Sequence, residues 1–394
     1  MHATDVLDTY LRMSCQAIHE ARWRALKDCV GGLLLGRQLS VTGLGRTLAV
    51  GGHEKHRIKK ADRLIGNPRL KEELPLLYRA VSQLVVGKQT RPVILVDWSD
   101  VTPDQKHHVL RASVPIGGRA ITLYEEVHLQ ADYGSRSVHA RFLRALRDQL
   151  RPEVRPILVS DAGFKAPWFK AVERMGWSWV GRIRAKALVR RNVREEWYSC
   201  TELHHQIARQ PKCLGEFEVT RSNPVHCMLF GVRKPKKGRV SRTSQGKRRR
   251  SQHSNKNARR EREPWLIGTS LTSLDPGEVI GIYAKRMEIE EAFRDTKSRQ
   301  YGFGLELTRS RSKSRLAVLM ALGSLASLVA WLLGRVAECH GMSKRLQANT
   351  IRHRRVLSTV FIGLAALRNQ FRFKRREVAL AVFDLRARAA SWAL

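Results

Sequence analysis

The chain has 394 residues and carries 73 Lys and Arg against 35 Asp and Glu, a formal net charge of +38. Hydrophobic residues make up 43% of it, which supports sizeable cores and excludes a disordered chain or a small disulfide scaffold. The length suggests two or three domains. The charge indicates a polyanionic partner, with nucleic acid favoured over an anionic membrane surface.

The sequence lacks the motifs of zinc-binding, secreted, serine-nucleophile and ATP-binding proteins. The six cysteines show no C-x-x-C pair and no zinc-type spacing, which fits a reduced, cytoplasmic protein. The first five residues carry an acid where a signal peptide carries Lys or Arg. Neither a G-x-S-x-G motif nor a P-loop is present, which argues against a serine nucleophile and against ATP.

Residues 1–90 have the apolar spacing of helices and are expected to form a helical DNA-binding region. A short helix is expected within 39–48, and the basic segment 53–63 follows it. This pattern is typical of a helix-turn-helix-like DNA reader, but a small helical bundle with a solvated basic face fits it equally well. The sequence leaves both interpretations open.

In residues 91–185 the helical spacing of apolar residues gives way to short continuous apolar runs. Strands are expected at 92–96, 108–115, 120–127, 157–159 and 177–183, with helices at 139–150 and 167–175. Gly117-Gly118 predicts a hairpin between the second and third strands. The order of three strands, helix, strand, helix, strand indicates a mixed α/β sheet.

Residues 186–263 interrupt this order as a basic insertion. Within it, residues 233–262 hold 14 Lys and Arg against one acid, which predicts either a solvated loop or a flexible phosphate clamp. After the insertion, the core resumes with its second part, residues 264–310, which begins with a strand expected at 265–268. Asp275 as N-cap, Pro276 in the first turn and Glu278 in capping-box position then predict one helix running to about Arg299.

The C-terminal region, 311–394, is expected to be helical and to contribute DNA contacts or dimerisation. Residues 316–334 form an uncharged run just long enough to span a bilayer. Gly323, Ser324 and Ser327 dilute its apolar character. We therefore expect a buried helix rather than a membrane span.

Asp97 and Asp161 are each the first carboxylate after a buried apolar strand. Ligand sites in open α/β sheets lie outside such strand ends, although a single Asp there is more often a turn former or a helix cap. Two carboxylates on adjacent strands would repel each other unless protonated or bridged by cations such as Mg²⁺.

A third carboxylate is selected by helical spacing. Four residues spaced 3, 4 and 7 apart fall within an arc of roughly 60° on the expected helix: Tyr283, Arg286, Glu290 and Lys297. Arg294 lies close to this stripe, whereas Glu291 points away from it. The stripe places one acid among cations, which suits phosphoryl transfer, although a solvated face with ion pairs has the same pattern.

Together these motifs resemble the bacterial insertion-sequence transposases of the DDE, cut-and-paste type. The resemblance rests on the segments 96–100 and 159–164 and on the Tyr-x2-Arg-x3-Glu-x6-Lys signature from Tyr283 to Lys297. It implies a ribonuclease-H-like core interrupted by a mainly β insertion and flanked by helical N- and C-terminal regions. Asp97, Asp161 and Glu290 would be catalytic and bind two Mg²⁺ ions, with Mn²⁺ as a substitute.

The resemblance also implies how DNA is bound and cut. Phosphates at the transposon end would be contacted by Tyr283, Arg286 and Lys297, with Arg294 beside them. Trp265 is in a suitable position for the aromatic residue that holds a flipped base in relatives, although a Trp at a strand start is at least as often part of the core. Met287 stands where some relatives carry Trp. The reaction would be nicking, hairpin formation, hairpin opening and strand transfer into target DNA, by a homodimer on double-stranded DNA in the nucleoid.

Three other readings remain open from the sequence. A structure-specific nuclease would use the same core without strand transfer. An inactive, basic DNA-binding regulator would bind the ends without cutting them. A role at a membrane surface is the weakest of the three.

Overall fold

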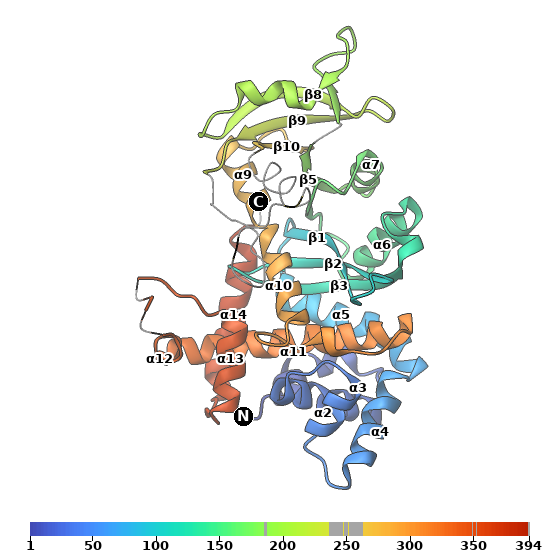
Figure 1. The fold of residues 1–394 in the computed structure, drawn as a ribbon, viewed down its shortest axis with the longest axis vertical. Coiled ribbons are helices and arrows are strands. Elements are labelled where there is room, and N and C mark those ends of the chain that lie inside the picture. The colour runs from blue at the N-terminus through green and yellow to red at the C-terminus, as the bar shows by residue number, and fades with distance from the viewer. Residues whose placement is uncertain are drawn as a thin grey trace. The chain divides into compact units, whose positions relative to one another are not determined.

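The computed structural model describes residues 1–184, 187–235, 247, 251, 263–348, 350–351 and 353–392. It divides into two compact units, one formed by Met1–Pro156 with Lys285–Leu394 and the other by Ile157–Ala284 (Figure 1). Most of the basic segment 233–262 lies outside the described residues. Its expected role as a phosphate clamp stays a prediction.

The first unit is built on a three-stranded antiparallel sheet. Its order is β3 (Ala120–Leu129), β2 (His107–Pro115), β1 (Val93–Asp100). Asp97 of β1 stands opposite Arg111 of β2. Gly117 and Gly118, with φ of 88° and 90°, form the turn between β2 and β3, and this confirms the predicted hairpin.

Helices cover this sheet and extend the unit. They are α1 (Asp5–Tyr10), α2 (Glu20–Gly36), α3 (Val41–Thr47), α4 (Glu54–Ile65), α5 (Pro68–Val86), α6 (Arg136–Gln149), α10 (Met287–Lys297), α11 (Lys313–Cys339), α12 (Met342–Leu346), α13 (Thr359–Arg368) and α14 (Arg375–Ala390). The N-terminal helices are therefore packed in the same unit as the C-terminal ones, since α2 and α5 both contact α11.

Helix α11 is the central element of the first unit. Figure 1 shows it passing between the sheet and the N-terminal helices, and it contacts β3, α2 and α13. It is long and apolar enough to cross a membrane, but 83% of its most apolar window is buried inside the protein. This agrees with the expectation of a buried helix.

The small and polar residues within α11 have specific packing and hydrogen-bonding roles. A Cβ on Gly334 would stand 1.9 Å from the Thr359 carbonyl oxygen of α13, so the two helices touch through their backbones. Ser324 donates a hydrogen bond of 2.7 Å to Glu125 of β3. The glycine permits a close helix crossing, and the serine satisfies a buried acid.

The second unit is mostly β. Its strands run in the order β4 (Ile157–Ser160), β5 (Ser178–Ile183), β10 (Trp265–Thr269), β9 (Val225–Val232), β8 (Lys212–Val219), β6 (Leu188–Arg190), β7 (Tyr198–Ser199). Strands β4 and β5 are parallel and are linked by α7 (Ala166–Arg174), whereas the other pairs are antiparallel. The last helix of the unit is α9 (Pro276–Ala284). The whole chain is thus mixed α/β, as expected.

The prediction of one continuous helix from Asp275 to about Arg299 is wrong. Its start is confirmed, because Asp275 Oδ1 accepts the Gly277 N–H at 2.7 Å and Glu278 accepts the Asp275 N–H at 3.0 Å. The helix ends at Ala284, however, and α10 begins at Met287. Tyr283 therefore lies on a different helix from Glu290.

Tertiary contacts account for this break, since no Pro or Gly stands at it. The Lys285 ammonium lies 3.6 Å from the centroid of the Trp392 ring. The Arg286 guanidinium reaches Asp97 on β1. Both contacts are long-range in sequence, which is why local spacing did not reveal the break.

Candidate active site

Helix α10 carries Glu290, the predicted third carboxylate, and its own sequence explains how it is held. Acids occupy its first turn and bases its last, which suits the helix dipole. Its apolar residues Ile289 and Phe293 are buried. The helix packs across β1, β2 and β3, so its polar residues flank a fixed apolar strip.

Arg286 joins Asp97 to Glu290. Its Nη2 lies 2.6 Å from Glu290 Oε1, and its Nη1 lies 3.5 Å from Asp97 Oδ2. The guanidinium side chain is only 15% exposed. Two acids from elements almost 200 residues apart are thus held around one buried cation.

The Asp97 carboxylate is oriented by its own strand. Its Oδ1 accepts the Trp98 N–H at 2.9 Å. The Trp98 indole in turn donates to His139 Nε2 at 3.1 Å. Burial lowers the pKa of His139 to about 4, so the ring is neutral at pH 7 and accepts this bond.

Lys297 completes the group from the last turn of α10. Its ammonium donates to Ser99 Oγ at 2.7 Å. Burial lowers the pKa of Lys297, while the carboxylates of Asp100 and Asp97 oppose that shift. The side chain therefore supplies a partly desolvated positive charge beside β1.

The two acids, Lys297 and the Trp98 and Ser99 side chains line one cavity of about 510 Å³ within the first unit. Its walls include four predicted site residues: Asp97, Glu290, Arg294 and Lys297. Arg294 is exposed and bonded to Glu291 at 2.7 Å. The cavity combines carboxylates with cations, which is the combination that phosphoryl transfer requires.

The other predicted residues belong to the second unit. Asp161 follows β4, and its Oδ1 accepts the Gly163 N–H at 2.8 Å. Trp265 and Tyr283 lie edge to face with ring centroids 5.0 Å apart, and the Lys234 ammonium is 5.0 Å from the Trp265 ring. The expected joining of Asp161 to Asp97 and Glu290 stays a prediction.

The donor set suits a hard divalent cation. Asp97 and Glu290 offer carboxylate oxygens, the ligands that Mg²⁺ prefers, and a cation already stands between them. Within either unit, over the part of the chain that the structure describes, no three His, Cys, Asp or Glu side chains gather into a complete metal site.

Sequence reasoning missed several residues of the site. Ser99 bonds Lys297, and Glu288 and Asp295 attach the opposite side of α10 to the β2–β3 turn. Ser99 falls within the motif 96–100, and Glu288 lies two residues before Glu290 on the same helix. A stricter use of helical spacing could have identified the pair Glu288 and Asp295.

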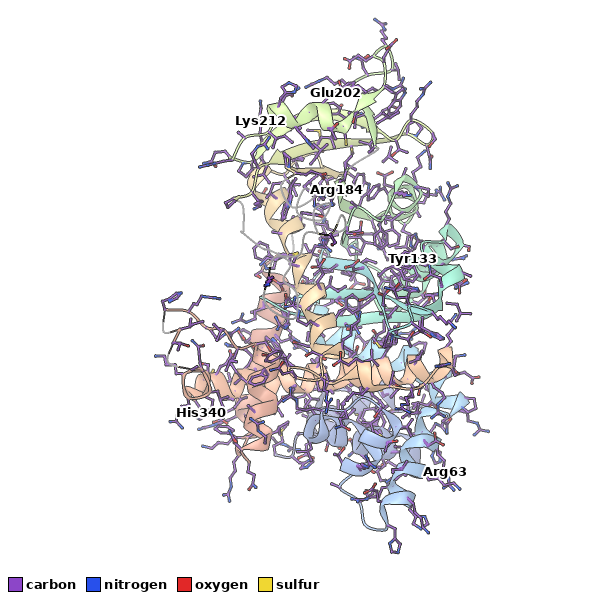
Figure 2. The ribbon with its side chains drawn as sticks, viewed as in Figure 1. Arg63, Tyr133, Arg184, Glu202, Lys212 and His340 are labelled. Carbon is purple, nitrogen blue, oxygen red and sulfur yellow. The ribbon has the colours of Figure 1, made fainter. Side chains whose placement is uncertain are left out.

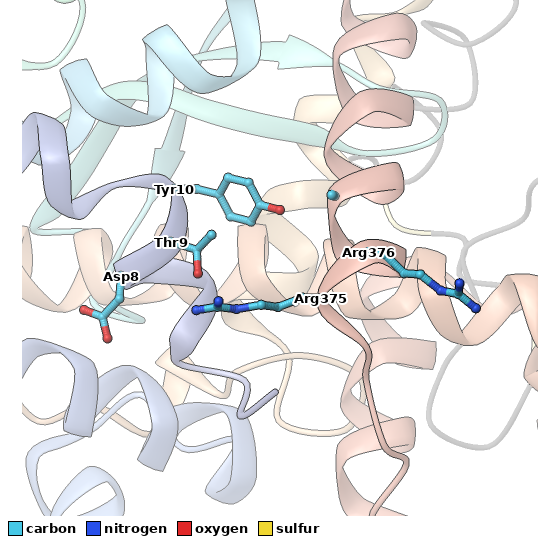
Figure 3. Close-up of a pocket in the computed structure, with 6 residues that line it drawn as sticks. Asp8, Thr9, Tyr10, Arg375 and Arg376 are labelled. Atoms are coloured by element: carbon cyan, nitrogen blue, oxygen red, sulfur yellow. The ribbon is translucent and has the colours of Figure 1, made fainter.

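A second cavity of about 460 Å³ lies between α1 and the start of α14. Figure 3 shows the Tyr10 ring and the Arg375 side chain extending into the space between these elements, while Arg376 points away. Burial raises the pKa of Tyr10. This cavity contains a single acid, Asp8, so it lacks the paired carboxylates of the first.

Comparison with known proteins agrees with the geometry. Residues 88–327 match the family model of the transposase DDE domain, which is more than half of the chain. No curated protein matches the chain. Members of this family cleave DNA, transfer strands and generally use divalent metal ions. This protein belongs to the family of DDE transposases.

Proposed function

We propose that this chain is the transposase of a bacterial insertion sequence. It binds the terminal inverted repeats as double-stranded DNA, cleaves the ends by two-metal phosphoryl transfer through hairpin intermediates, and joins them to target DNA. The observation that carries the proposal is the Arg286 bridge between Asp97 and Glu290 in a cavity that Lys297 and Arg294 also line. A cavity lined by Asp97, Glu290, Arg294 and Lys297, with Arg286 pairing the two acids, suits a phosphodiester substrate.

The proposed metal ligands are Asp97, Glu290 and, from the second unit, Asp161. These residues would hold two Mg²⁺ ions, or Mn²⁺ in their place, which would supply Lewis-acid activation of a water or 3′-hydroxyl and charge stabilisation at the leaving oxygen. Arg286 holds Asp97 and Glu290 together against their mutual repulsion. Trp98 and Ser99 fix the orientation of Asp97 and Lys297.

The cations of the site are assigned to the DNA backbone. Lys297 and Arg294 lie on the cavity wall, where they neutralise negative charge on a phosphate. Arg286, Tyr283 and Trp265 are assigned to the transposon end, with Trp265 stacking on a flipped base. The Trp265 ring packs edge to face on Tyr283, which is buried, so Trp265 is the more exposed member of this pair.

The fold supports a ribonuclease-H-like core. Three antiparallel strands, α6, a strand, α7 and a further parallel strand follow one another in the chain. Strands β6 to β9 fill the predicted insertion between Asp161 and Glu290. The proposed domain boundaries are those expected from the sequence: 1–90, 91–185, 186–263, 264–310 and 311–394.

Helix α4 is the proposed DNA-contacting element of the N-terminal region. Its exposed side carries Lys55, Lys59 and Arg63, at successive four-residue steps, and Arg63 is labelled in Figure 2. The neighbouring Lys60 is instead paired with Asp28 at 2.6 Å. The exposed stripe is therefore available for phosphates or groove edges.

Binding through this stripe is expected to be steeply salt-dependent. Each neutralised phosphate contributes about −0.9 to the slope of log K against log salt. Substituting both Lys55 and Lys59 by Gln should make the slope less steep by about 1.8, measured by fluorescence anisotropy on labelled ends. Lys60→Gln, which removes a lysine already paired with Asp28, is the control. A change in slope per lysine as large as that of the double variant would contradict the assignment.

The chemistry is tested by cleavage and joining with the purified protein, Mg²⁺ and DNA that carries the element's ends. Asp97→Asn, Asp161→Asn and Glu290→Gln should each lower cleavage by at least about 10³-fold while end binding persists. Glu291→Gln is the control on the same helix. Cleavage that survives Asp97→Asn or Glu290→Gln refutes the assignment, whereas hydrolysed but never joined products favour a nuclease.

The proposed assembly is a homodimer in the DNA complex, because both ends must be cut together. Its mass in solution, free and bound to paired ends, is the direct measurement. End binding without any metal-dependent nicking would instead favour a DNA-binding regulator.

A further inference from the structure

Helix α10 has a second polar face that the proposed chemistry does not use. Taking about 100° per residue, Glu288 and Asp295 lie within about 20° of each other, and Glu290 and Lys297 lie on the opposite side. Glu288 and Asp295 are 8% and 4% exposed, so both acids are buried. Buried acids need partners, and these two find them in one short loop.

That loop is the turn between β2 and β3. Glu288 Oε2 accepts two consecutive backbone N–H groups, those of Ile116 and Gly117, each at 3.0 Å. The positive φ of Gly117 and Gly118 gives the turn a conformation that most residues avoid. A carboxylate that accepts two such donors is held in one orientation.

The other end of α10 is attached to the same loop. Arg119 donates from Nε to Asp295 Oδ2 at 2.5 Å and from Nη2 to Oδ1 at 3.3 Å. Burial raises the pKa of Asp295, and the Arg119 contact opposes that shift. The two attachments are seven residues apart, about 10 Å along the helix, so they restrain both its tilt and its rotation.

We propose that Glu288 and Asp295 are positioning residues that hold α10 on the β2–β3 turn and thereby set Glu290 against Asp97. This inference rests on the proposed function. The turn belongs to the strand β2 that pairs with β1, and Asp97 lies in that pairing. Rotation or sliding of α10 would move Glu290 and Lys297 together away from β1.

The test is single-turnover cleavage by the full-length protein on saturating DNA ends. Glu288→Ala should lower the cleavage rate constant by about 10²-fold, which is the cost of displacing a reacting group by near 1 Å. The affinity for DNA ends should change by less than about 2-fold. Glu288→Gln keeps an oxygen that accepts both N–H groups and should stay within about 3-fold of wild type. Glu72→Ala, which removes an exposed acid of α5 in the same unit, is the control.

A second measurement separates the positioning role from the reaction. Amide hydrogen exchange at Ile116 and Gly117 should accelerate in Glu288→Ala and stay slow in Glu288→Gln. If the wild type cuts no DNA, the proposed function fails, and this exchange pattern alone decides whether the attachment exists.

Three results would overturn the inference: wild-type cleavage by Glu288→Ala, equal defects in the Ala and Gln variants, or unchanged exchange at the turn. If Glu288→Ala does not fold, Arg119→Gln takes its place. It should slow cleavage without loss of end affinity, and a wild-type rate would count against the proposal.

Discussion

The Arg111–Glu125 pair beneath α10 provides the sharpest test of how the site is supported. Both side chains are almost fully buried, 2% and 1% exposed, and Arg111 Nη2 lies 2.7 Å from Glu125 Oε2. The guanidinium also lies 4.5 Å from the centroid of the Phe293 ring of α10. Glu125 further accepts from Tyr78 and Ser324.

Arg111→Met removes the cation and leaves the acid buried. Breaking a buried ion pair on one side costs about 3 to 5 kcal/mol. For a unit of this size, each kcal/mol shifts the unfolding midpoint by about 2 to 4 °C, so we expect a decrease of about 6 to 20 °C. The measurement is thermal unfolding followed by circular dichroism, together with urea titration at 25 °C.

The matched control is the double variant Arg111→Met with Glu125→Gln. It removes the uncompensated charge but keeps an acceptor for Tyr78 and Ser324. We expect it to recover most of the lost stability. A single variant that loses less than about 1 kcal/mol, or a double variant no more stable than the single one, would refute the reasoning.

Two further predictions concern stability. Because burial lowers the folded-state pKa of His139 to about 4 from 6.5, its contribution to stability is complete above pH 6.5 and is lost as the pH falls toward 4. Urea titrations should show about 2 kcal/mol less stability at pH 5 than at pH 7 from this residue, and an equal pH dependence in His139→Leu would contradict this. Gly334→Ala should cost about 1 to 3 kcal/mol or more, because its Cβ would stand 1.9 Å from a backbone oxygen. Gly323→Ala meets movable side-chain methyl groups, the nearer at 3.0 Å, and should cost less in the same titration.

Local sequence was informative where local interactions determine the structure. The turn at Gly117-Gly118 and the cap at Asp275 were predicted because each depends on a few neighbouring residues. Asp161 lies directly after β4, as the apolar run indicated, whereas β1 continues through Asp97 to Asp100 because its pairing with β2 extends past the apolar run. Apolar periodicity reflects which side chains are buried, and the apolar runs of these short strands are almost fully buried.

The choice of Glu290 over its neighbours was also accessible from spacing, although the helix used for it was wrong. Spacing within α10 is preserved, so Glu290 and Lys297 still share a face. Tyr283 was included only by assuming that the helix continued through residues 285 and 286. That assumption failed because Lys285 and Arg286 make contacts with residues distant in the chain.

The sequence by itself determined the chemical inventory: a strongly basic chain, two acids after buried strands, and a third acid among cations on a helix. Tertiary structure decided which acid serves which purpose, since Glu288 binds a turn while Glu290 binds Arg286. It also decided that α11 is a core helix. The reason is physical: propensity and periodicity act over a few residues, whereas ion pairs and packing join residues far apart in the chain.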